Sequence, residues 1–152
     1  MVMAIAVALH ALAAVVWVGG MFFAYACLRP ALAAEAPPQR LAVTAGALRR
    51  FFPWVWAAVG VLLVSGFGQV PRLGGFAGIG LHVQLMMGLG IVMMLLFGHL
   101  YFAPNRRLQA AVGRADWAEA GRQLGTVRRI VEINLVLGLL TAAIGASGRY
   151  WG

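Results

Sequence analysis

Four apolar stretches, each long enough to cross a bilayer, constrain this chain more than any other feature. A spanning helix needs roughly 20 predominantly apolar residues, and stretches over about 2–28, 53–70, 79–102 and 130–147 meet that length. The chain is 62% hydrophobic and only 11% charged, which is atypical of a soluble domain. The sequence therefore predicts an all-α membrane protein, with residues 1–152 forming one antiparallel bundle of four transmembrane helices.

Prolines and charged residues predict where these helices begin and end. No basic residue precedes Arg29, so the charged leader of a secretory signal is missing and we expect 2–28 to be a retained spanning helix. We expect a short surface helix over 39–50, a second spanning helix opening at Pro53, and a third that stops at Pro104.

Asp116 predicts an early start for the fourth helix. Glu119 follows three residues later, as in a capping box. We therefore expect this helix to begin near Trp117, before it enters the membrane, and to cover 117–147.

The distribution of charge predicts the orientation. The net charge is +8, from 12 basic residues that are all arginine. Most lie in the first and third connections, while the second connection holds only Arg72 and the C-terminal tail only Arg149. By the positive-inside rule, both Arg-rich loops face the cytoplasm and both termini face outward. The charge is explained by topology, so a nucleic-acid partner is not expected.

All three histidines lie inside or at the ends of apolar stretches: His10 in the first, His82 and His99 at the two ends of the third. An ionisable, metal-binding side chain is costly in hydrocarbon and therefore suggests function. His10 and His82 belong to the outer half and would share one site if their helices are neighbours. His99 lies roughly 25 Å beyond His82 along the helix and cannot join that site.

Other potential ligands recur at helical spacing beside these histidines. Trp17 and Met21 follow His10 on one stripe of the first helix, and Met86 and Met93 follow His82 on the third. Imidazole and thioether groups suit Cu(I), but methionine and tryptophan stripes are also common packing residues. For the methionines and the tryptophan alone, packing is the favoured interpretation.

Few residues suit catalysis. Glu132 is the one acidic residue in a spanning stretch, and an ion pair with Arg128 or Arg129 on the same helix is its simplest role. There is no HExxH motif or phosphate loop, which favours a binding or transport role over an enzyme. Cys27 is the only cysteine, so any haem would not be covalently attached.

The segments 9–21 (His10, Trp17, Gly19-Gly20), 49–54 (Arg-Arg-Phe-Phe-Pro-Trp) and 81–102 (Leu-His82 through His99) resemble the copper-resistance D (CopD) family. That family consists of multi-pass proteins of the bacterial inner membrane. The resemblance implies copper binding, uptake or resistance, with His10 and His82 as metal ligands and possible help from Met21, Met86 and Met93. A periplasmic copper-binding protein or a second copy of the chain would then be candidate partners, besides the lipid bilayer.

The same histidine positions also resemble the HemJ family of four-helix membrane proteins, which is associated with b-type haem and protoporphyrinogen oxidation. Gln84 stands where that family has lysine, which argues against the oxidase activity but not against haem. Three hypotheses remain open: a copper-handling protein, a b-type haem protein using His10, His82 or His99 beside Trp17, and an accessory subunit without a ligand.

Overall fold

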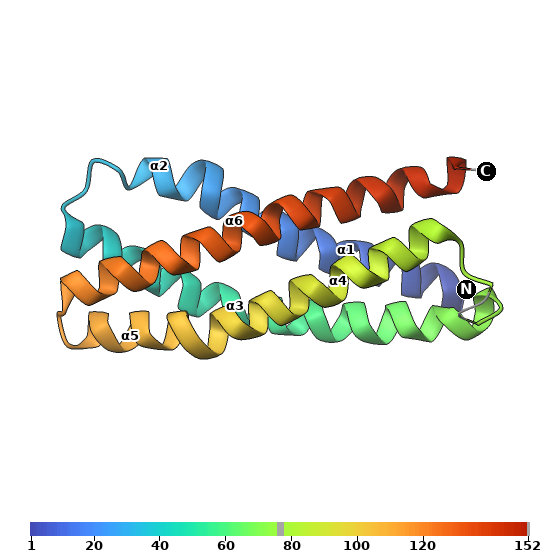
Figure 1. The fold of residues 1–152 in the computed structure, drawn as a ribbon, viewed down its shortest axis with the longest axis horizontal. Helices are drawn as coiled ribbons and strands as arrows, with labels where there is room; N and C mark the ends of the chain where they lie inside the picture. Colours follow the sequence, from blue (N-terminus) through green and yellow to red (C-terminus); the bar gives the residue numbers. More distant parts are fainter. Residues whose placement is uncertain (76–77, 152) are drawn as a thin grey trace.

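A computed structural model describes residues 1–75 and 78–151 of the chain. Its helices form an elongated antiparallel bundle, with both termini at the same end (Figure 1). Four helical segments in the described part are long and apolar enough to span a membrane, as predicted. The elements are α1 (Val2–Phe23), η1 (Ala24–Leu28), α2 (Arg29–Ala31), α3 (Pro37–Gln69), η2 (Val70–Leu73), α4 (Leu81–Leu100), η3 (Tyr101–Asn105), α5 (Arg106–Gly113), α6 (Trp117–Ser147) and η4 (Gly148–Tyr150).

The second spanning helix does not begin at Pro53. Instead α3 begins at Pro37 and continues for 33 residues with Pro53 inside it, so the surface helix expected over 39–50 is the first part of α3. A proline inside a helix removes one backbone hydrogen bond and costs about 3 kcal/mol. Helix residues before and after it, such as Leu41 and Val55, are buried in the core. This packing outweighs the local penalty.

The third helix does not stop at Pro104 either. The segment η3 around Pro104 is one turn of π-helix, and the rod continues through α5 to Gly113. Proline has no N–H and its ring collides with the preceding turn of an α-helix. The wider π turn accommodates both defects, so the chain does not have to break there.

One of the two hydrogen bonds of the expected capping box is present at the start of α6; the backbone N–H of Asp116 donates instead to the carbonyl of Ala111. The Asp116 side chain accepts a hydrogen bond from the backbone N–H of Glu119 at 3.0 Å, and the helix begins at Trp117.

Aromatic rings form the centre of the bundle, around Phe97 of α4. Its ring lies 5.9 Å from that of Trp17 on α1, 5.5 Å from Phe52 and 5.1 Å from Trp56 on α3, all edge-on. Such T-shaped pairs are favourable beyond the area they bury. Three of the long helices therefore meet at this one ring, while large apolar side chains such as Val15 and Val64 stay exposed on the outside, where lipid would cover them.

Glycines let the helices approach closely at several points. A Cβ atom added at Gly20 of α1 would lie 2.3 Å from the ring of Phe51 on α3, and one at Gly138 of α6 would lie 2.8 Å from Val18 of α1. Lipid gives helices no hydrophobic reason to associate, so such close contacts supply much of the packing energy.

The neighbouring glycines 19 and 20 provide a matched test of this packing. Gly20→Ala should destabilise the fold by about 1–3 kcal/mol because its methyl group overlaps Phe51. Gly19→Ala should be neutral or slightly stabilising, since no described atom lies within 4 Å of the new methyl. Unfolding both variants in mixed detergent micelles measures the difference. Equal stabilities would show that α1 and α3 are not packed as described.

Candidate functional site

His10 lies on the side of α1 that faces α3, where it forms a polar contact with Ser65. Its Nδ1 atom is 2.8 Å from the Ser65 Oγ atom, and the Ser65 hydroxyl is 2.6 Å from the backbone carbonyl of Val61. A hydroxyl has one proton, and the carbonyl of Val61 can only accept it. If the Ser65 hydroxyl donates to that carbonyl, its Oγ accepts from His10, and this arrangement predicts the imidazole proton on Nδ1 and a lone pair on Nε2.

Gly66 gives the His10 imidazole room beside Ser65. A Cβ atom at Gly66 would lie 3.5 Å from Cε1 of His10, so the ring rests against the backbone of α3. The histidine is half-buried, whereas Ser65 is buried. The imidazole is thus held in one orientation by a partner on another helix, the usual arrangement of a histidine ligand.

His82 faces a different helix. A Cβ atom at Gly148, just after α6, would lie 2.4 Å from Cβ and Cγ of His82, and the imidazole lies 6.3 Å edge-on from the Trp151 ring. His10 packs against α3 and His82 against the end of α6, so the structure does not bring their two rings together. Each is a separate candidate ligand near the end that holds the termini.

The methionines below His82 also pack on glycines of α6. A Cβ atom at Gly145 would lie 2.8 Å from Cε of Met86, and one at Gly138 would lie 3.1 Å from Cε of Met93. The Met93 sulfur accepts a weak hydrogen bond from Thr141 at 4.0 Å. The His–Met stripe of α4 is therefore in the first place the surface that packs on α6.

His99 and Glu132 lie away from these contacts. His99 is exposed on α4, toward the opposite end from His82. Glu132 accepts a hydrogen bond from the Tyr25 hydroxyl at 3.1 Å. The expected ion pair with Arg128 or Arg129 is absent, because within residues 1–75 and 78–151 Arg122–Glu119 is the one ion pair. The Tyr25 contact is between helices, and sequence spacing could not reveal it.

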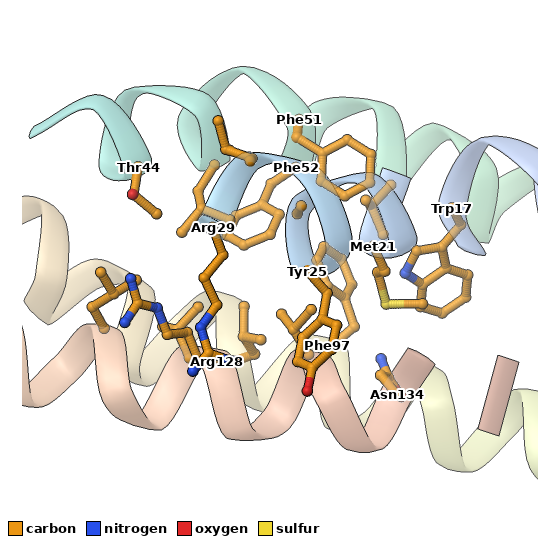
Figure 2. A pocket seen from close by; sticks show the side chains of 18 residues that line it. Trp17, Met21, Tyr25, Arg29, Thr44, Phe51, Phe52, Phe97, Arg128 and Asn134 are labelled. Carbon is orange, nitrogen blue, oxygen red and sulfur yellow. The ribbon is translucent and has the colours of Figure 1, made fainter. Parts of the chain in front are cut away.

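A cavity of about 70 Å³ lies between the helices, in the half of the bundle away from the termini. Trp17, Met21 and Asn134 line one end, and Arg29 and Arg128 line the other (Figure 2). The wall between them is almost entirely apolar. Trp17 and Met21 are thus buried in the bundle interior, 2% and 3% exposed.

Asn134 carries an unused hydrogen-bond acceptor into this region. Its Nδ2 donates to the backbone carbonyl of Met93 at 3.2 Å, an interhelical bond. Its Oδ1 is buried, and no atom of the described residues donates to it. The residue is only 2% exposed, so this free carbonyl oxygen is a costly feature. Sequence analysis assigned Asn134 no role in a site.

The candidate ligands do not gather into one cluster. No group of three or more His, Cys, Asp or Glu side chains gathers in the described part of the chain. The haem hypothesis is also unsupported. Ligand pockets usually have a volume of roughly 300–1,000 Å³, several times that of the central cavity, and no histidine lines that cavity.

The model of the copper resistance protein D (CopD) family matches residues 45–147, more than half of the chain. The chain belongs to the CopD family. It is therefore a multi-pass membrane protein related to copper resistance. The match covers most of α3 and all of α4, α5 and α6, including His82, but not α1 with His10. No curated protein and no solved structure matches the chain, and the resemblance to HemJ is not supported.

The hydrogen bond from His10 predicts a measurable tautomer. In neutral His10 the proton should sit on Nδ1, and Ser65→Ala should move it toward Nε2 because the acceptor is lost. Nitrogen-15 chemical shifts of histidine-labelled protein distinguish the two forms, with exposed His99 as the internal control. An Nε2–H tautomer in the unaltered protein would contradict the assignment.

Proposed function

We propose that this protein handles copper as a cargo and that the Nε2 atom of His10 is the principal contact for the ion. The observation that carries the proposal is the His10–Ser65 hydrogen bond at 2.8 Å, which fixes the imidazole and leaves one nitrogen lone pair free. Metal-binding histidines depend on such a partner for orientation and basicity. Membership of the CopD family supports copper as the metal.

Cu(I) is the ion that the remaining donors suit. Imidazole and thioether ligands favour it over harder cations. From His10, the buried face of α1 leads past Trp17 to the thioether of Met21, which lines the central cavity together with Asn134. These groups provide a second set of donors deeper in the bundle.

His82 is a secondary contact in this proposal. It is partly exposed near the same end as His10 and makes no hydrogen bond to another described side chain. Met86 and Met93 support it mainly by holding α4 against α6. Because His82 and His10 face different helices, we expect them to bind copper independently.

Copper affinity of the purified full chain tests the proposal. His10→Ala should weaken Cu(I) binding at least about tenfold, and Ser65→Ala should weaken it less, because only the orienting partner is lost. Competition with a coloured Cu(I) chelator gives the affinities. His99→Ala is the matched control, since it removes an exposed imidazole at the other end of α4 and should leave the affinity unchanged.

The results for the two histidine variants show which histidine, if either, is a copper ligand. Full affinity in His10→Ala with loss in His82→Ala would show that copper binds, but on α4 and not on α1. Full affinity in both variants would show that neither histidine is a ligand.

For the membrane orientation we propose that both termini face outward and that both Arg-rich loops face the cytoplasm of the bacterial inner membrane. The start of α3, which holds Arg40, and α5, which holds Arg107, lie at the same end of the bundle, away from the termini (Figure 1). Positively charged segments are retained on the cytoplasmic side during insertion. His10 and His82 then lie in the outer half, where copper would first arrive.

Single-cysteine variants test the orientation. In a Cys27→Ser background, Trp151→Cys should react with a membrane-impermeant maleimide in intact spheroplasts. Glu35→Cys, in the turn between α2 and α3, should react only after the membrane is broken. The reverse pattern would show that the bundle is inserted the other way.

A further inference from the structure

Two guanidinium groups from separate helices line the Arg-rich end of the central cavity, and the charge of a third acts on one of them. Arg29 follows η1 and Arg128 belongs to α6, and both line the cavity side by side (Figure 2). Arg40 of α3 lies close enough for its charge to act on Arg128, as does that of Arg29. The three residues are far apart in sequence, so the fold itself creates this concentration of positive charge.

No carboxylate in the described part of the chain neutralises the cluster. The one described ion pair lies elsewhere, between Arg122 and Glu119, and nearby Glu132 accepts its hydrogen bond from Tyr25. Arg29 is held over the Tyr25 ring, with its Cζ atom 5.6 Å from the ring centroid. Arg128 is partly buried, so its charge has lost part of its hydration without gaining a counter-ion.

The wall next to the two arginines is aliphatic. Leu28, Leu48, Leu124, Val127 and Val131 line the cavity between them and the aromatic centre. A phosphate group matches paired guanidinium groups in charge and geometry. The cavity volume of about 70 Å³ would take only the first methylene groups of a chain attached to that phosphate.

We propose that this end of the cavity binds an anionic phospholipid, with the phosphate on Arg29 and Arg128 and the start of one acyl chain against the aliphatic wall. Basic pockets between transmembrane helices bind anionic headgroups in this way. The occupant is a lipid and not a free anion, because the arginines border an apolar cavity at the end of a membrane-spanning bundle. The proposal is independent of copper binding.

Native mass spectrometry of the detergent-purified full chain tests this. After incubation with equal amounts of phosphatidylglycerol and phosphatidylcholine of the same acyl chains, the protein should retain the anionic lipid at least about tenfold more. Arg29→Gln/Arg128→Gln should abolish that preference. Arg107→Gln/Arg114→Gln, which removes two exposed charges outside the cavity, should preserve it, and Arg29→Lys/Arg128→Lys should preserve part of it.

Two further measurements distinguish a lipid site from other causes. Val131→Phe fills the aliphatic wall without changing the charge and should lower retention of phosphatidylglycerol severalfold. Millimolar inorganic phosphate should not displace the lipid. Any one of four results would overturn the proposal. The unaltered protein could retain both lipids equally, or the Gln double variant could keep the preference for phosphatidylglycerol. The control variant could lose that preference to the same extent, or inorganic phosphate could displace the lipid. Thermal melting confirms that every variant is folded before its lipids are counted.

Discussion

The structure depends on large side chains of one helix packing directly against glycine backbone of another. Gly138 and Gly145 of α6 and Gly148 of η4 pack against Met93, Met86 and His82 of α4, at separations that leave little or no room for a Cβ atom. In lipid, burying apolar side chains between helices gains little over leaving them in contact with acyl chains. Close van der Waals contact and a few interhelical hydrogen bonds must therefore supply the specificity, and the bond from Asn134 to Met93 adds to it.

The same packing fixes where the candidate ligands point. His82 rests on Gly148 and His10 on Gly66, so each imidazole is held at a different helix interface. The two histidines therefore have different packing partners. Among the described histidine side chains, His10 has a hydrogen bond to another side chain, and that bond predicts which of its nitrogens is free. The proposed copper handling would therefore use one- or two-ligand contacts at separate helix interfaces.

Hydrophobic length predicted the four spanning helices and the capping box predicted the start of α6, because both signals are local. The helix boundaries predicted at Pro53 and Pro104 are wrong for a related reason. A proline disrupts its own helix locally, but the packing that offsets this cost comes from other helices and is not visible in the sequence. Likewise nothing in the sequence pairs His10 with Ser65, or Tyr25 with Glu132, across 55 and 107 residues. Polar residues inside a spanning stretch can be identified from the sequence as candidate functional residues. Their hydrogen-bond partners follow only from how the helices are arranged.

Charge divides the proposed copper route into two unequal parts. The half near the termini offers imidazole, while the other end of the cavity presents Arg29 and Arg128. At roughly 8 Å and an effective dielectric constant of about 20, each guanidinium repels a monovalent cation by about 2 kcal/mol. Two such groups would therefore hold Cu(I) back from the cytoplasmic end. An anionic lipid phosphate between them would cancel most of that repulsion, so under both proposals the membrane composition would influence how easily the ion crosses.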